Sequence, residues 1–274
     1  MNAAKPKEGK LMLVLDEKFD YEIPRNFRID DKLKAAASGQ FSERTLKTAL
    51  QKIDGQVTLV DLRRESHGFV NGIPVSWYEP QNNSNKNIST QAILSKEKAQ
   101  LQELKSQSPL MVSLIINKAN GVIQKTEPVE LIIKSLETEQ ELAARLGLQY
   151  VRFQVLDRHR PDDEVVDEFV NFVKKVPANT WLYFHCRGGK GRSTTFMALY
   201  DILHHGKTES LKKILSRQHA LGGIDLDKFS DQPKDQWKIE MANDRKEFIE
   251  QFYRYATDSN GYPDITWQEW LKRK

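Results

Sequence analysis

The sequence predicts an α/β protein in which a mixed, mainly parallel sheet is flanked by helices. Between residues 138 and 206, strand-like and helix-like patterns alternate, as they do when covering helices join parallel strands. Within this region the apolar run 181–185 precedes a glycine-rich loop and then a helical pattern that ends near Gly206. The loop between them holds the only cysteine of the chain, Cys186.

The elements before residue 138 follow from helix caps and apolar runs. Residues 24–28 are expected to be an extended lead-in, and Ser42 can cap a helix that Asp54-Gly55 closes. Residues 57–62 are apolar enough for a central strand, which ends in a polar cluster, 63–67, of the kind that open α/β sheets use for ligands.

The middle of the chain has hairpin signals. Residues 68–77 predict a turn into a short aromatic strand, and 91–105 predict an amphipathic helix. The apolar runs 110–116 and 129–133 around Asn120-Gly121 predict a β-hairpin or part of a small barrel.

The second half is more regular. Thr138 and Glu141 form a capping box for a short helix, and 150–155 is a strand that delivers Asp157. Helices are expected over 162–175, 210–220 and 236–256, the last one stopping around Asn260-Gly261.

Composition limits the class of protein. The net charge of +4 suits a small anionic substrate but falls short of the basic surface of a nucleic-acid binder. One cysteine excludes an intramolecular disulfide and a cysteine-rich zinc site. No apolar run is long enough to span a membrane or to form a signal-peptide core, so we expect a soluble protein that is cytoplasmic, or exported by another route or after processing.

The loop 186–192 has the composition of a phosphate-binding site. Gly188, Gly189 and Gly191 allow backbone N–H groups to turn inward at a helix N-terminus, which binds a phosphoryl dianion and favours the thiolate of Cys186. Arg192 can grip two phosphate oxygens.

Three further groups complete the predicted chemistry. Ser193 or Thr194 can donate to the cysteine sulfur, and His185 is expected to orient the loop. Asp157 is the expected acid for the leaving oxygen. Arg187 and Lys190 on the loop, with Lys238 and Arg245 on one face of the last long helix, favour a substrate with several phosphates.

At these residues the sequence resembles the bacterial protein-tyrosine-phosphatase-like phytases, which are cysteine-dependent inositol polyphosphatases. The loop alone is typical of the whole tyrosine-phosphatase superfamily. The family-specific part is the block of Asp-Leu-Arg, Glu-Ser-His-Gly-Phe and Asn-Gly-Ile-Pro-Val-Ser-Trp at 61–63, 65–69 and 71–77.

The resemblance implies a tyrosine-phosphatase-like core over 21–274 with a small partial β-barrel built from about 68–134, after a flexible tail and lead-in over 1–20. It implies metal-independent, cofactor-free, stepwise dephosphorylation of myo-inositol hexakisphosphate and lower inositol polyphosphates through a phosphocysteine. By position, Cys186 is the nucleophile, Asp157 the general acid and Arg192 the phosphate clamp. The expected substrate-binding residues are Arg28, Arg63, His159, Arg187, Gly188, Gly189, Lys190, Gly191, Lys238 and Arg245, with Lys118 and Lys125 as weaker candidates.

Departures from the family pattern bear on which phosphate leaves first. Arg158 follows Asp157, and the histidine comes one place later. Two alternatives stay open: a protein-tyrosine or phosphoinositide phosphatase with the same mechanism, and a non-catalytic inositol phosphate scaffold. The partner is expected to be a small molecule and not nucleic acid or membrane; a monomer is favoured.

Overall fold

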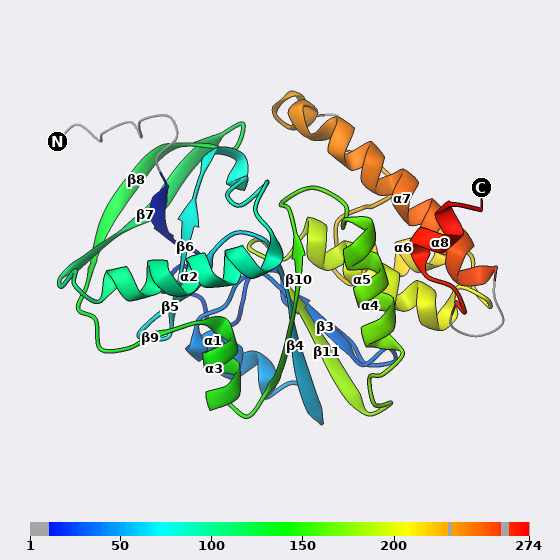
Figure 1. Cartoon of the computed structure of the whole chain (residues 1–274), viewed down its shortest axis with the longest axis horizontal. Helices are drawn as coiled ribbons and strands as arrows, with labels where there is room; N and C mark the ends of the chain where they lie inside the picture. Colours follow the sequence, from blue (N-terminus) through cyan, green and yellow to red (C-terminus); the bar gives the residue numbers. More distant parts are fainter. Residues whose placement is uncertain (1–10, 230–231, 259–262, 274) are drawn as a thin grey trace.

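The computed structural model describes residues 11–229, 232–258 and 263–273 (Figure 1). The expected polar tail, 1–10, and the expected helix stop at Asn260-Gly261 lie outside these residues. The described residues form two sheets, each with its own hydrophobic core.

A five-stranded sheet carries the site region, in the order β10-β4-β11-β3-β2. Four neighbouring strands run parallel and β2 pairs antiparallel at one edge, so the prediction of a mixed, mainly parallel sheet is confirmed. The strands are β2 (Arg28–Asp30), β3 (Ala35–Ser38), β4 (Gln56–Arg63), β10 (Gln149–Val155) and β11 (Thr180–His185).

Both faces of this sheet are covered, so its central strands β3, β4 and β11 are buried along almost their whole length. Along β11, Leu182 and Phe184 face one core, whereas Trp181 and Tyr183 face another. The first core joins the sheet to five helices, and the second joins it to two. These are α4 (Asp163–Val173), α5 (Gly191–His205), α6 (Leu211–Ala220), α7 (Ile239–Thr257) and α8 (Trp267–Leu271) on one side, and α1 (Glu43–Leu50) and α3 (Glu139–Arg145) on the other.

A six-stranded sheet forms the second lobe in Figure 1, in the order β8-β7-β1-β6-β5-β9. It is an open sheet that includes the expected hairpin and extends beyond the expected limits of 68–134. Its strands are β1 (Met12–Leu15), β5 (His67–Val70), β6 (Ile73–Tyr78), β7 (Leu110–Ala119), β8 (Val122–Leu131) and β9 (Leu136–Glu137). Strand β1, within the segment expected as tail and lead-in, joins the hairpin to the rest of the sheet.

The capping residues and the amphipathic pattern of the sequence predict the positions of several helices correctly. Ser42 accepts from the Thr45 amide at the start of α1, and Thr138 and Glu141 form the capping box of α3. Helix α2 (Thr90–Leu104) lies where the amphipathic pattern predicts it. The last long helix begins later than expected, because η2 (Pro233–Lys238) is a 3₁₀ segment with proline at its start.

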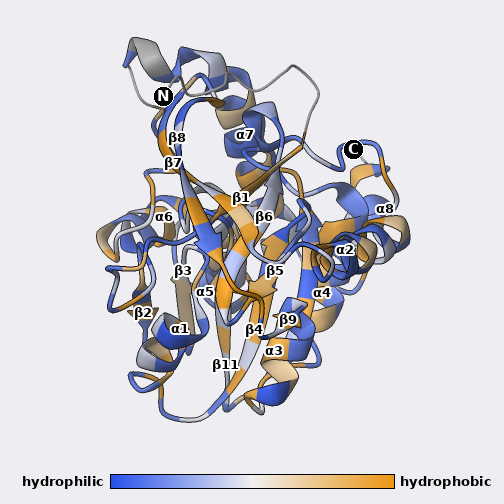
Figure 2. Ribbon diagram, turned by 90° about the vertical axis from the view of Figure 1, so that its left-hand side faces the viewer, coloured by the Kyte–Doolittle hydropathy of each residue, from blue (hydrophilic) through white to orange (hydrophobic). Residues whose placement is uncertain are grey.

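The hydropathy colouring of Figure 2 agrees with this arrangement: strands such as β4 and β5 are largely hydrophobic, whereas α7 carries much hydrophilic colour. Across the described ranges, no helix has both the length and the apolar content to cross a bilayer.

Candidate active site

The loop between β11 and α5 holds Cys186 at the carboxyl end of a central strand. Strand β11 ends at His185 and α5 begins at Gly191, so the loop lies at the N-terminus of a 15-residue helix. The thiol is 3% exposed, and its sulfur accepts a hydrogen bond of 3.3 Å from the Ser193 hydroxyl. The geometry brings these two groups together as the sequence predicts.

The carbonyl groups of the loop turn away from the cysteine. Side chains of the segment before β3, and one main-chain amide, hold them from outside: Arg25 and the Gln40 amide on the Arg187 oxygen at 3.2 Å, Asn26 on Gly188 at 2.7 Å, and Arg28 on Gly189 at 2.8 Å. Because the carbonyls point outward, the loop amides are left facing the bowl above the sulfur.

Gly189 is required by close packing as well as by its backbone. Its φ is +69°, and a Cβ at this position would lie 2.2 Å from the Gly39 nitrogen. Gly188 has open space around it. The loop therefore needs a glycine at 189 in order to lie against Ser38 and Gly39.

Arg192 is buried below the loop and is held by Glu65. Its Nη1 lies 2.7 Å from one carboxylate oxygen and its Nη2 2.9 Å from the other. Burial disfavours the charge, but Glu65 and Asp157 outweigh it and hold the pKa of Arg192 well above its ordinary value. Burial also disfavours the Glu65 carboxylate, but Arg192 and Arg63 together hold the pKa of Glu65 well below its ordinary value.

The Nε atom of Arg192 is buried and has no hydrogen-bond partner in the part of the chain that the structure describes. A buried donor of this kind is costly unless something occupies it. A phosphate oxygen in the bowl would satisfy it, and the neighbouring Nη2 would supply the second half of a bidentate grip.

Asp157 follows β10 and lies at the same sheet edge. Its Oδ1 is 3.1 Å from Arg192 Nη2, and its Oδ2 is 3.3 Å from the Asn82 amide and 3.5 Å from Arg158. The carboxyl group is 23% exposed, so it has access to a ligand in the bowl.

A cleft of about 780 Å³ opens above Cys186. Its wall is formed by Asp157 and the loop, by the segment after α6, by η2 and α7, by Arg25, and by Lys118 of β7. Among the residues that the structure describes, the basic lining residues outnumber the four aspartates: they are Arg25, Lys118, Arg158, Arg187, Lys190, Lys228, Lys238, Arg245 and Lys246. Such a cleft attracts a strongly anionic ligand.

The predicted residues divide into two groups by position. Arg187, Gly188, Lys190, Gly191, Lys238 and Arg245 line the cleft, and so does the weaker candidate Lys118; Lys125 is not among the lining residues. Arg28, Arg63, His159 and Gly189 are not among the described lining residues either.

Arg28 and Arg63 are committed to the protein itself. Arg28 donates to the Gly189 carbonyl and to the Thr194 hydroxyl, and burial lowers its pKa to about 10. Arg63 is fully buried, with Nη1 2.8 Å from Asp16 and Nε 3.0 Å from Glu65. These contacts leave both arginines beneath the loop and not at its open face.

Sequence reasoning missed several residues that shape the site. Arg25, Arg158, Lys228 and Lys246 line the cleft without any motif that would single them out. Asp16, in the expected tail and lead-in, is 2.6 Å from Arg187 and holds that side chain at the rim. Only the polar cluster after β4 hinted at the role of Glu65.

The comparisons with known proteins agree with this geometry. The model of the PTP-like phytase family, whose description is inositol hexakisphosphate, matches residues 60–204. A PTP-like myo-inositol phosphatase from Mitsuokella multacida, solved with myo-inositol-(1,3,4,5)-tetrakisphosphate, is 32% identical, with a TM-score of 0.90 over 99% of this chain and 49% of its own. A PTP-like phytase from Bdellovibrio bacteriovorus is 34% identical, with a TM-score of 0.81 over 98% of each chain.

The effector protein hopD2 of Pseudomonas syringae pv. tomato is 30% identical over 79% of this chain and 46% of its own length. The chain thus spans about half of the length of hopD2 and of the Mitsuokella protein. A loop of this kind between a parallel strand and a helix, with an aspartate at the same sheet edge, is typical of tyrosine-phosphatase-like proteins. Within that class, the chain belongs to the PTP-like phytase family.

Proposed function

We propose that this chain is a phosphatase that removes phosphates stepwise from myo-inositol hexakisphosphate and lower inositol polyphosphates. The observation that carries the proposal is the cleft above Cys186, which within the described residues is lined by nine basic side chains and four aspartates. One phosphate needs only the loop amides and Arg192; the remaining cations suit a ligand with phosphates on several sides.

Catalysis would proceed through a phosphocysteine. The thiolate of Cys186 attacks phosphorus while the P–O bond to the inositol oxygen breaks, and the protonated carboxyl of Asp157 gives its proton to that oxygen. Water then attacks phosphorus, Asp157 takes a proton from it, and the sulfur leaves as thiolate with help from Ser193. The loop amides and Arg192 stabilise the charge on the equatorial oxygens.

We assign supporting roles to the arginines beneath the loop. Arg28 holds the loop through the Gly189 carbonyl, and Arg63 holds Glu65, which in turn holds Arg192. Direct substrate contacts then fall to Arg187, Lys190, Lys238 and Arg245, together with Lys118 and Arg158, which line the same cleft.

The proposal is tested by comparing phosphate release from soluble inositol hexakisphosphate, a phosphotyrosine peptide and phosphoinositide vesicles. We expect the fastest turnover on the first. Negligible release from it together with rapid release from either of the others would reject the substrate and leave the cysteine chemistry intact. Product mapping with and without a metal chelator checks that release is stepwise and metal-independent.

A non-catalytic scaffold is the second candidate. The juxtaposition of Cys186, Arg192 and Asp157 argues against it, because binding alone needs neither a thiol nor an acid. Cys186→Ser should keep binding and lose turnover; binding without turnover in the parent protein would favour the scaffold.

A further inference from the structure

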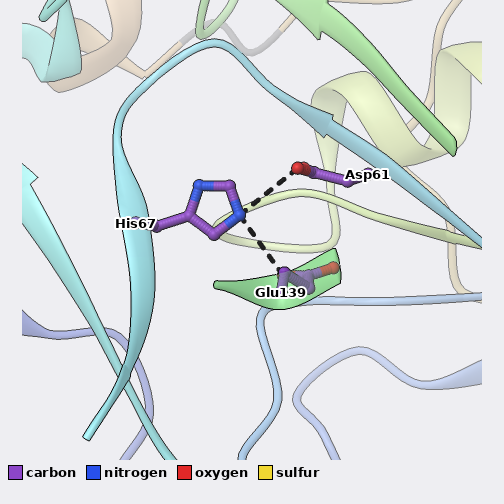
Figure 3. A group of neighbouring side chains, drawn as sticks. All are labelled: Asp61, His67 and Glu139. Atoms are coloured by element: carbon purple, nitrogen blue, oxygen red, sulfur yellow. Dashed lines mark ion pairs between the residues drawn. The ribbon is translucent and has the colours of Figure 1, made fainter. Parts of the chain in front are cut away.

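A cluster of buried ionisable groups lies outside the cleft lining and contacts His185, the residue before the nucleophile. His67 on β5, Asp61 on β4 and Glu139 at the start of α3 come from three elements and are each no more than 1% exposed (Figure 3). His67 Nε2 lies 3.3 Å from Asp61 Oδ2 and 3.3 Å from Glu139 Oε2. The catalytic steps above use none of the three.

Both ring nitrogens of His67 lie beside oxygen atoms. Its Nε2 forms no hydrogen bond within the described residues, so its contacts with the two carboxylates are ionic. Its Nδ1 is 2.9 Å from the Glu65 carbonyl and 3.7 Å from the Glu97 carboxylate, while Nε2 faces the other two carboxylates. A neutral imidazole could donate on one side only, which would leave a lone pair facing either the Glu65 carbonyl or the Asp61 and Glu139 carboxylates. The surroundings therefore favour the doubly protonated ring, although Arg152 Nη2 also approaches Nδ1 at 3.4 Å.

Charge pairing points the same way. Arg152 forms ion pairs with Asp61 at 3.0 Å and with Glu97 at 3.0 Å. In the described part of the chain, Glu139 has no ion pair with lysine or arginine; the histidines His67 and His185 are its only ionic neighbours. A nearby cation stabilises a buried carboxylate, and an imidazolium at 67 would supply one to Oε2 of Glu139.

Burial and Arg63 each lower the pKa of His67, but the carboxylates around it, Asp61 foremost, raise it to about 10. The ring then stays charged through neutral pH. Tyr150 is a further ionisable group in contact with the cluster. Its hydroxyl donates to Asp61 at 2.9 Å, and burial holds the pKa of Tyr150 well above its ordinary value.

Glu139 connects the cluster to both sides of Cys186. Its Oε1 lies 2.5 Å from Nε2 of His185, the residue before the nucleophile. Its Oε2 accepts a hydrogen bond of 3.0 Å from the side-chain amide of Gln40. The main-chain N–H of Gln40 donates to the carbonyl of Arg187, the residue after the nucleophile. A shift of this carboxylate would move the two residues that flank the sulfur.

We infer that His67 is a positioning residue, an imidazolium that binds Asp61 and Glu139 together so that Glu139 fixes the residues on either side of Cys186. The inference rests on the proposed function only for its kinetic readout. A divalent metal ion on the same three side chains is the competing occupant. It would place two positive charges beside Arg152, which already lies 3.0 Å from Asp61, whereas one proton completes the pairing of Glu139.

A double-mutant cycle tests the imidazolium. His67→Gln removes the cation, Glu139→Gln removes the carboxylate, and the double variant removes both. Each single variant should lower kcat about tenfold with little change in KM, and should slow alkylation of Cys186 by iodoacetamide; the double variant should recover much of both losses. Losses that simply add would overturn the inference.

Matched controls separate this role from general damage. His205→Gln removes another histidine–carboxylate contact, with Asp201 at 2.8 Å, near the far end of α5, and should leave the alkylation rate unchanged. Alkylation does not depend on the substrate, so it still tests the inference if inositol polyphosphates prove not to be substrates.

The parent protein provides a test that needs no variant to fold. In nitrogen-15 histidine spectra, both nitrogens of His67 should stay protonated from pH 6 to pH 9, and the purified protein should contain no stoichiometric metal. A neutral ring at pH 7, or bound metal whose removal by a chelator slows alkylation of Cys186, would contradict the assignment.

Discussion

The Nη2 atom of Arg192 lies 3.1 Å from Oδ1 of Asp157, so the expected acid forms an ion pair with the guanidinium that is expected to bind the phosphate. An incoming phosphate oxygen would compete with Asp157 for this donor. A second oxygen would bind Nε of Arg192, which has no hydrogen-bond partner among the described residues. Substrate binding would thus loosen Asp157 from Arg192 and leave its carboxyl group beside the leaving oxygen.

Asp157→Asn should lose far more rate on inositol phosphates than on an activated aryl phosphate. An alkoxide leaving group needs a proton, whereas a nitrophenolate does not, and general acid catalysis contributes about 10²–10⁴-fold. The measurement is kcat for the parent and the variant on both substrates. Equal losses on the two would show that Asp157 is not the acid.

Glu65→Gln should destabilise the protein as well as slow it. Arg192 would keep a buried charge without its bidentate partner, and breaking a buried pair costs about 3–5 kcal/mol. Urea unfolding gives the free energy of unfolding. The exposed pair of Lys47 and Glu43 is the control, since Lys47→Ala should cost no more than about 1 kcal/mol.

Gly189→Ala should lower the melting temperature and abolish turnover, because its Cβ would meet the Gly39 nitrogen and the backbone φ is +69°. Gly188→Ala is the neighbouring control for stability, since nothing lies within 4 Å of its Cβ. Similar melting temperatures for the two variants would argue against the packing constraint.

Arg158, the residue after the expected acid Asp157, contacts Trp237 and Gln81 at the edge of the cleft. Its guanidinium lies 4.7 Å from the Trp237 ring, donates to the Gln81 carbonyl and lies 3.5 Å from Asp157. Trp237→Leu should raise KM for inositol hexakisphosphate several-fold, in line with a contact worth about 0.5–2 kcal/mol. An unchanged KM would mean that the stacking does not help to hold Arg158 in the cleft.

Stability should depend on pH through His67. Its pKa in the folded protein, about 10, lies above the roughly 6.5 expected for an unfolded chain. The folded state therefore binds more protons, and the contribution of His67 is complete below pH 6.5 and is lost as the pH rises towards 10. Urea unfolding of the parent and of His67→Gln should show a difference that shrinks over this range; a constant difference would contradict it.

Local patterns in the sequence predicted the parts of the site that are local in the chain. The strand, the glycines and Arg192 stand within a dozen residues of Cys186, and the capping box of α3 is equally compact. The short strands β1, β2 and β3 were not predicted, because three or four residues give too little periodicity.

Long-range pairing explains the other gaps. Arg28 and Arg63 lie far from the phosphate-binding loop in the sequence but next to it in the fold. Nothing in the sequence shows that Arg28 binds the Gly189 carbonyl or that Arg63 pairs with Asp16 and Glu65. The contact of His67 with Glu139 likewise depends on β5 packing beside α3, which only the folded chain reveals.

The most direct test of the central claim is acid quenching of the parent protein during turnover of inositol hexakisphosphate, followed by mass analysis of the peptide that contains Cys186. We predict one added phosphoryl group on this peptide in the parent and none in Cys186→Ser. Turnover with an unmodified cysteine at every quench time, or turnover by Cys186→Ser at the parent rate, would contradict the account.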